Sequence, residues 1–329
     1  MSISEGLASS SAGLLGRICL HPLDTAKARL QSPNGGEFKN TLHVLRVAMT
    51  EEGVKGLYRG FGAVALGGTP GTCIYLTTYE ALKRHFLAAP LMQDEGNHFL
   101  AYSAAGMLAE AACCIVYTPV DIVKERLQIQ RPPEQALKQG NTAMRSATNY
   151  TGSWNALTTI AASEGVIGLY KGYWATLASF GPYSALYFVL YEKLKTHWTG
   201  GSPPPGTREG SFKAPAAQHQ AEIPFVVSLS QAAAASAIAS WATNPLDLAK
   251  LRLQVQRAKT GSAGSVTAVS CTRYTGMLHV LISVFKSGGF PALFKGSGAR
   301  VLFATPFTAV CMATYERFKL FWGRIIDDT

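Results

Sequence analysis

Apolar stretches without charge alternate with short charged stretches along this chain of 329 residues. Three of the apolar stretches begin at a Gly, end at a Glu 20 residues later and carry a Pro at the middle. They span residues 60–80, 172–192 and 296–316, and Arg300 is the only charged residue inside them. A helix of about 20 residues rises about 30 Å, which matches the hydrocarbon core of a bilayer. Each stretch is therefore predicted to be a transmembrane helix.

Three further apolar stretches are rich in Ala, Ser and Gly, which allow helices to approach closely in lipid. They span residues 3–22, 99–119 and 224–245. Amphipathic runs at residues 41–53, 154–165 and 277–289 are too short to cross a bilayer and are predicted to lie on its surface. The predicted fold class is an all-α membrane protein with six transmembrane helices and three short surface helices.

The chain repeats itself three times, with three ordered motifs in each copy. The first, P-x-D-x-x-K-x-R-x-Q, occupies Pro22–Gln31, Pro119–Gln128 and Pro245–Gln254. The second occupies Glu52–Gly60, Glu164–Gly172 and Gly288–Gly296, and the last of these lacks the leading Glu. The third, YExxK, occupies Tyr79–Lys83, Tyr191–Lys195 and Tyr315–Lys319. We expect repeats at residues 1–90, 91–199 and 222–329, with a Pro- and Gly-rich linker at 200–221.

Composition narrows the class of protein further. Charged residues make up 15% of the chain and hydrophobic residues 47%, and the net charge of +10 suits contact with anionic lipid or an anionic solute. No HExxH, Walker or GxSxG motif is present, so we expect neither an enzyme nor a metal site nor a cofactor. Basic residues are regularly paired with acids, which argues against nucleic-acid binding. The N-terminus has no basic or Arg-rich leader, so no cleavable presequence is expected.

The three motifs, in this order and number, resemble those of the mitochondrial carrier family across nearly the whole chain. The resemblance implies a pseudo-threefold barrel of six helices in the mitochondrial inner membrane, with both termini in the intermembrane space. It also implies a carrier that moves small solutes across the membrane by alternating access, with antiport as the expected mode, and that binds cardiolipin. One threefold barrel should suffice as the transport unit, so a monomer is expected.

The charges of the first motif have two interpretations. Asp and Lys three residues apart on a helix are neighbours and can pair locally. The resemblance instead implies pairs between repeats that close a gate on the matrix side, braced by Gln31, Gln128 and Gln254. Those pairs are Asp24–Lys124, Asp121–Lys250 and Asp247–Lys27.

The third motif repeats this logic at the other end of the barrel. The resemblance implies a cytoplasmic gate in which a Glu of each repeat pairs with a Lys of another. The expected pairs are Glu80–Lys195, Glu192–Lys319 and Glu316–Lys83.

Glycines at helix starts are candidates for binding lipid phosphate, because free N–H groups and the helix dipole favour anions there. The second motif ends in Gly60, Gly172 and Gly296, each after a basic residue, namely Arg59, Lys171 and Lys295. Gly152 and Gly276 begin two of the surface helices and match another lipid-contact pattern of the family.

Substrate choice is expected where the repeats differ from one another. Arg17 and Glu110 are charges that the other two repeats lack at the matching places, and an ionised residue inside a membrane is a functional candidate. By resemblance, the even-numbered spans contribute Gly67, Gly68, Ser179, Phe180, Arg300, Phe303 and Ala304. These residues favour a small anionic or zwitterionic organic solute. Alternatives are a metal ion, as in mitoferrins, or a cofactor such as S-adenosylmethionine.

Overall fold

The computed structural model describes residues 3–88, 98–130, 150–198, 225–257 and 274–327, which form helices and the turns between them. No strand occurs in these ranges, so the all-α prediction is confirmed for them. The long helices are α1 (Ile3–Gln31), α3 (Phe61–Ala88), α4 (His98–Gln128), α7 (Tyr173–Trp198), α8 (Phe225–Ala242) with its continuation α9 (Asn244–Val255), and α11 (Ser297–Asp327). The short ones are η1 (Pro33–Glu37), α2 (Thr41–Leu57), α6 (Ser153–Gly168) and α10 (Met277–Leu293).

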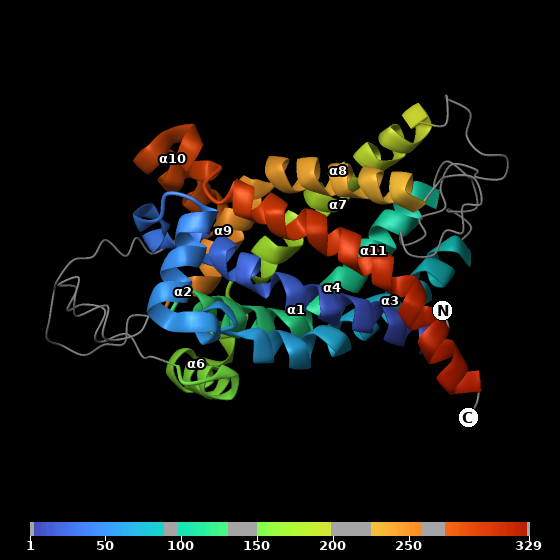
Figure 1. The fold of residues 1–329 in the computed structure, drawn as a ribbon, viewed down its shortest axis with the longest axis horizontal. Coiled ribbons are helices and arrows are strands. Elements are labelled where there is room, and N and C mark those ends of the chain that lie inside the picture. The colour runs from blue at the N-terminus through green and yellow to red at the C-terminus, as the bar shows by residue number, and fades with distance from the viewer. Residues whose placement is uncertain (1–2, 89–97, 131–149, 199–224, 258–273, 328–329) are drawn as a thin grey trace, which may run out of the picture.

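The long helices pack in a closed ring. Each contacts the next in chain order, and α11 packs against α1. Helices α1, α4 and α9 also contact one another, which brings the first motifs of the three repeats together. In Figure 1, α2, α6 and α10 lie at one end of the bundle, and both chain termini lie at the other.

The prolines of the first motif act differently in the three repeats. Pro22 and Pro119 lie inside α1 and α4, which continue through them. In the third repeat the helix breaks at Thr243, and Pro245 then stands in the first turn of α9, where its missing N–H costs no hydrogen bond.

Helices α2, α6 and α10 extend further than the sequence predicts. Each bends at the Gly that ends the predicted run, namely Gly53, Gly165 and Gly289, where φ is +65°, +70° and +65°. Only Gly adopts this left-handed conformation without a steric penalty. The chain then continues for about one more helical turn, up to the turn that starts the next long helix.

Small residues line the contacts between long helices. Alanines of one helix pack against a tyrosine of its neighbour in three places, and most of these alanines are fully buried. The three sets are Ala8 and Ala12 with Tyr315, Ala105 and Ala109 with Tyr79, and Ala235 and Ala239 with Tyr187. The small side chains let the backbones approach closely, as the sequence predicts.

Judged by length and hydropathy alone, few helices in the described ranges qualify individually as membrane spans. Residues 101–128 of α4 do so, and α10 and α11 do so as a pair across a bend of 58°. Helix α8 is apolar but shorter. The other long helices carry Gly, Thr, Ser and Tyr, which lower their mean hydropathy.

Candidate functional site

Three ion pairs join the first motifs of the repeats in a ring where α1, α4 and α9 meet. Each of Lys124, Lys250 and Lys27 places its Nζ 2.8 Å from a carboxylate oxygen, of Asp24, Asp121 and Asp247 respectively. Each side chain is at most 19% exposed. Of the two interpretations of these charges, the structure has the pairs between repeats rather than the local pairs within one helix. Each Lys therefore bridges two helices. We call these six residues the ion-pair ring.

Two of the three glutamines support the ring directly. Gln128 donates from Nε2 to Asp24 Oδ2 at 3.2 Å, and Gln254 donates to Asp121 Oδ2 at 3.0 Å. Gln31 instead donates to Asn244 Oδ1 at 3.1 Å, so its expected place beside the third ion pair is corrected. Asn244 precedes Pro245, a position where the other repeats have His21 and Thr118. At the matching contact Gln128 lies 3.5 Å from the Nε2 of His21, but it also reaches Asp24.

Arg300 lies beside the ring, although the sequence places it in a substrate site. Its Nε is 3.6 Å from Asp247 Oδ2, and its Nη1 donates to the carbonyl of Ser240 at 3.1 Å. Only 9% of Arg300 is exposed. A further carboxylate, Glu125, lies 3.2 Å from the Nζ of Lys124. One extra cation and one extra anion thus join the ring, which keeps its charges balanced in a buried setting.

A second layer of ion pairs was missed by the sequence reasoning. Arg29 holds Glu52 with two hydrogen bonds, of 2.7 and 3.0 Å, and donates from Nε to the carbonyl of Gln128 at 3.0 Å. The same contacts recur in the second repeat, where Arg126 holds Glu164. We call each Arg–Glu pair a clamp, because it ties a short helix to a long one and to the next repeat.

The signal for the clamps is present in the motifs themselves. The Arg of P-x-D-x-x-K-x-R and the Glu that opens the second motif occur together in repeats one and two. Arg59 adds a second cation to Glu52 at 3.1 Å, and Lys171 does the same for Glu164. Burial by itself raises the pKa of Glu164, but Arg126 and Lys171 outweigh it and lower the pKa to about 2.

The YExxK motifs lie at the opposite end, near the chain termini. Lys195 is buried, Glu192 and Glu316 are exposed, and Glu80 is partly buried. The Nζ of Lys83 lies over two aromatic rings, 5.9 Å from the centroid of Tyr79 and 5.5 Å from that of Tyr102. The Glu–Lys pairing expected at this end, which also includes Lys319, stays a prediction.

A cavity of about 440 Å³ lies between α1, α3, α7 and α11. Among the described residues that line it, Arg17 is the only charged one. The Arg17 guanidinium donates to the hydroxyl of Tyr117 at 2.9 Å and lies 5.9 Å from the centroid of the Phe307 ring. Arg17 is therefore held in place by aromatic neighbours while its charge borders the cavity.

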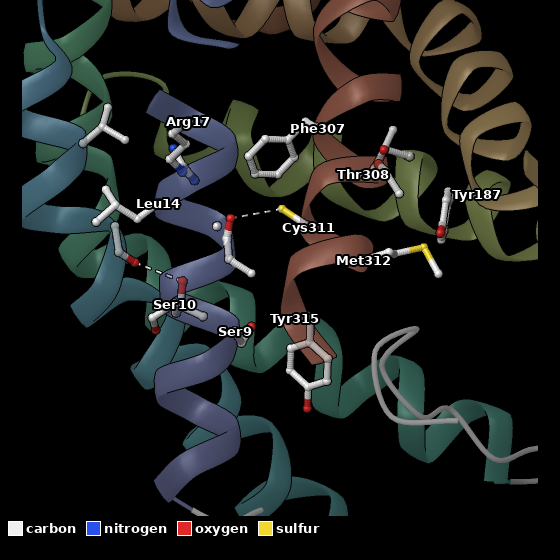
Figure 2. A pocket seen from close by; sticks show the side chains of 16 residues that line it. Ser9, Ser10, Leu14, Arg17, Tyr187, Phe307, Thr308, Cys311, Met312 and Tyr315 are labelled. Atoms are coloured by element: carbon white, nitrogen blue, oxygen red, sulfur yellow. Dashed lines mark hydrogen bonds between the residues drawn. The ribbon is translucent and has the colours of Figure 1, made fainter. Parts of the chain in front are cut away.

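The rest of the cavity wall is mostly hydroxyl, aromatic and sulfur groups that the sequence did not single out. Figure 2 shows Cys311 directed toward α1, where its thiol donates to the carbonyl of Ala12, and Met312 directed toward Tyr187. Thr308 and Tyr315 of α11 line the same space, as does Tyr183. To predict that these side chains line the cavity, the rotation of each helix about its own axis must be known, and no sequence motif gives that rotation.

The predicted contact residues on α3 separate into two roles. Gly68 lines the cavity, and a Cβ built on it meets no atom within 4 Å. Gly67 faces α4, and a Cβ there would lie 2.4 Å from Val120 Cγ2. The structure thus places Gly68 at the cavity and gives Gly67 a packing position.

The other predicted contacts lie outside the residues that line this cavity. Ser179 donates to the carbonyl of Ala175 at 2.7 Å, and the Phe180 ring packs edge-on against Tyr75. Phe303 stacks on Phe307, and the carbonyl of Ala304 accepts a bond from Thr308. A role for Ser179, Phe180, Phe303 and Ala304 in substrate binding stays a prediction.

Glu110 also lies outside the cavity wall, on α4. Its Oε1 accepts a weak bond from the thiol of Cys114 at 3.5 Å. Glu110 is partly buried, and its predicted role in substrate binding stays a prediction.

Two of the predicted lipid-contact glycines share a second cavity, of about 240 Å³. Gly60 and Gly152 line it together with Arg59 and the start of α6. Gly276 holds the equivalent position at the start of α10.

The closing glycines of the second motif also allow close approach between repeats. A Cβ on Gly60 would lie 2.9 Å from the carbonyl of Lys124, and one on Gly172 or Gly296 would lie 2.9 or 2.8 Å from a glutamine of the first motif. All three have φ between +81° and +85°. These glycines therefore have a structural reason to be Gly that does not depend on lipid.

The ring of helices, its threefold contacts and its central cavity define a helical carrier built from three repeats. A family sequence model described as "Mitochondrial carrier protein" matches residues 2–89, 95–202 and 221–325. The chain belongs to the mitochondrial carrier family, whose members are transporters rather than enzymes, and the resemblance seen in the motifs is confirmed.

Several relatives are similar over almost the whole chain. Mitochondrial substrate carrier family protein E of Dictyostelium discoideum is 31% identical over 97% of this chain and 96% of its own. Mitoferrin of the same organism is 29% identical over 96% of this chain and 93% of its own. The mitochondrial aspartate-glutamate transporter AGC1 of Saccharomyces cerevisiae is 30% identical over 95% of this chain but only 31% of its own length.

Proposed function

We propose that this carrier moves a small anionic or zwitterionic organic solute across the mitochondrial inner membrane by alternating access. The observation that carries the proposal is Arg17, the only charged group among the described residues that line the central cavity. A partly buried guanidinium with aromatic neighbours forms strong, directional hydrogen bonds with a carboxylate or phosphate.

Embedding of the ring in a bilayer is supported by its outer surface. Large apolar side chains such as Leu66, Trp174, Val226 and Leu302 are more than half exposed on the long helices. In water such residues would be an aggregation hazard, whereas in lipid they are stabilised. The proposed barrel counts α8 and α9 as one span, which gives six spans among the described residues, with both termini in the intermembrane space.

The ion-pair ring acts as the matrix gate in this proposal. It closes the matrix end while the cavity receives solute from the other end. Desolvation offsets much of the attraction within buried ion pairs, so the ring stabilises the closed state by a modest net amount, and differential binding of a solute is enough to open it. The YExxK residues then pair at the cytoplasmic end, and the cycle runs as an exchange within a single monomer.

A metal ion is the second candidate cargo, because Cys311 and Met312 border the cavity and mitoferrins are among the relatives. Against it, no cluster of three or more His, Cys, Asp or Glu side chains suited to a metal occurs within the described part of the chain. The positive charge of Arg17 in the cavity wall also repels a metal ion.

Cardiolipin is the proposed lipid partner. The cavity shared by Gly60 and Gly152 lies at the start of α6, where unpaired N–H groups suit a phosphate. The equivalent starts at Gly172, Gly276 and Gly296 would give two further sites by the threefold repeat.

A ligand screen by thermal unfolding tests the cargo class. Purified protein in detergent with cardiolipin is heated with carboxylates, amino acids, nucleotides, S-adenosylmethionine or divalent metals, since a ligand of the folded state raises Tm. The proposal predicts a rise with an organic acid or amino acid that Arg17→Gln abolishes and the exposed Arg46→Gln retains. A rise with metals alone, unchanged in Arg17→Gln, would assign the protein to metal transport instead.

A further inference from the structure

The clamps of the first two repeats share one arrangement of charges. In each, a Glu carboxylate lies between two cations, one from the first motif and one from the second. In the first repeat the cations are Arg29 and Arg59, and in the second they are Arg126 and Lys171. One carboxylate thus neutralises part of the charge of a pair of neighbouring cations.

The third repeat keeps both cations and lacks the carboxylate. Arg252 and Lys295 hold the places of the two cations, and Gly288 holds the place of the Glu. The neighbouring position changes as well. Gly56 and Gly168 make room for the Glu side chains, whereas the third repeat has Ala292, 2.8 Å from where a Gly288 Cβ would lie. The third repeat is thus built without an acidic side chain here.

Arg252 is nevertheless oriented as its counterparts are. Its Nε donates to the carbonyl of Gln31 at 3.3 Å, as the Nε of Arg29 and of Arg126 donate to the carbonyls of Gln128 and Gln254. This bond fixes the guanidinium, and no acidic partner for it occurs among the described residues.

Lys295 is fixed by its backbone in the turn before α11. Asn244 donates from Nδ2 to the carbonyls of Leu293 and Lys295, at 2.9 and 3.4 Å, which holds this turn against α9. Burial, and then the positive charge of Arg252, lower the pKa of Lys295.

We propose that Arg252 and Lys295 form a binding site for a small oxyanion, a phosphate or carboxylate group that occupies the place of the missing Glu. The bound group would accept two hydrogen bonds from the guanidinium and one from the ammonium, as the carboxylate of Glu164 does in the second repeat. The site lies beside the ion-pair ring and outside the central cavity, and it does not depend on the identity of the cargo.

The consequence is regulation of the closed matrix end by an anion. Without a clamp, no ion pair among the described residues ties α10 to α9, whereas Arg29–Glu52 ties α2 to α1 and Arg126–Glu164 ties α6 to α4. An anion there would complete the third clamp, stabilise the closed ring and slow its opening. Phosphate in solution and the phosphate of a lipid headgroup share the chemistry that this site recognises.

Thermal unfolding of the full chain in detergent without added lipid provides the test. Inorganic phosphate is compared with chloride at equal ionic strength, and an anionic short-chain phospholipid forms a second arm. For wild type we expect phosphate to raise Tm by about 2 °C. Arg252→Gln should lose this rise, while Lys286→Gln, a change of an exposed cation on α10, should keep it.

A tethered carboxylate gives a second variant that does not rely on removing a cation. Gly288→Glu combined with Ala292→Gly recreates the arrangement of the first two repeats. This double variant should have a higher Tm than wild type without phosphate and should no longer respond to phosphate.

The outcomes separate the sources and the sites. A rise with phosphate that Arg252→Gln loses supports a free anion, and a rise with lipid alone that Arg252→Gln loses supports a headgroup. A rise lost in Arg17→Gln but kept in Arg252→Gln places the anion in the central cavity and overturns this proposal without harming the proposed function. No response to either anion, or an equal response in Arg252→Gln, also overturns it.

Discussion

Lys124 of α4 reaches Asp24 of α1 at 2.8 Å, although Asp121 lies three residues away on its own helix. Lys27 and Lys250 likewise pair with an Asp of another repeat, so each of the three Lys residues joins two repeats. A pair within one helix would stabilise only that helix. Pairs between helices make the contact of three helices depend on charge, which is the property that a gate requires.

Removal of one carboxylate from the ion-pair ring should destabilise the protein strongly. Asp121→Asn leaves the partly buried Lys250 without its partner, and loss of one member of a buried pair costs about 3–5 kcal/mol. We expect a lower Tm, and exchange of the two residues as Asp121→Lys with Lys250→Asp should recover much of the loss. A Tm unchanged in Asp121→Asn would contradict a closed ring.

Asn244 should matter to stability because it accepts the bond from Gln31. Asn244→Ala removes this acceptor and also two donations to the turn before α11. A buried polar group left without its partner costs about 1–3 kcal/mol. Chemical unfolding of Asn244→Ala and of wild type measures the difference. Equal stabilities would show that Gln31 finds another acceptor.

The two neighbouring glycines of α3 give a matched pair. Gly67→Ala should lower Tm, because the new methyl group meets the side chain of Val120. Gly68→Ala meets open space at the cavity and should leave Tm equal or slightly higher, because Ala favours the helix. The reverse order of the two Tm values would mean that α3 is rotated relative to the structure.

Glu164 should make stability depend on pH. Its pKa in the folded protein is about 2, below the unfolded value of 4.5. A carboxylate shifted in this direction stabilises the fold above its unfolded pKa, and the stabilisation is lost as pH falls toward the folded pKa. The Tm difference between wild type and Glu164→Gln should therefore shrink between about pH 5 and about pH 2. A difference that stays constant would exclude the clamp as its source.

The features that recur in all three repeats could be predicted from the sequence. The features that occur in one repeat only could not. Periodic motifs reveal the repeats, the long helices and the residues of the ring. The bond from Gln31 to Asn244 and the place of Arg300 beside Asp247 depend on which side chain each repeat carries at one particular depth. Which hydroxyl and sulfur groups line the cavity depends on how each helix is rotated about its axis. Small residues occur on every face of these helices, so the sequence does not show which face points inward.

Transport by the purified protein in cardiolipin-containing liposomes tests the central claim most directly. Uptake of the organic acid or amino acid found in the ligand screen is measured for wild type, Arg17→Gln and Arg46→Gln. Loss of the Arg17 charge, the only one among the described residues of the cavity wall, should lower the rate at least about tenfold, the effect of about 1.4 kcal/mol, while Arg46→Gln transports normally. Uptake by Arg17→Gln at the wild-type rate, with its Tm unchanged, would contradict a carrier that selects its cargo by this charge.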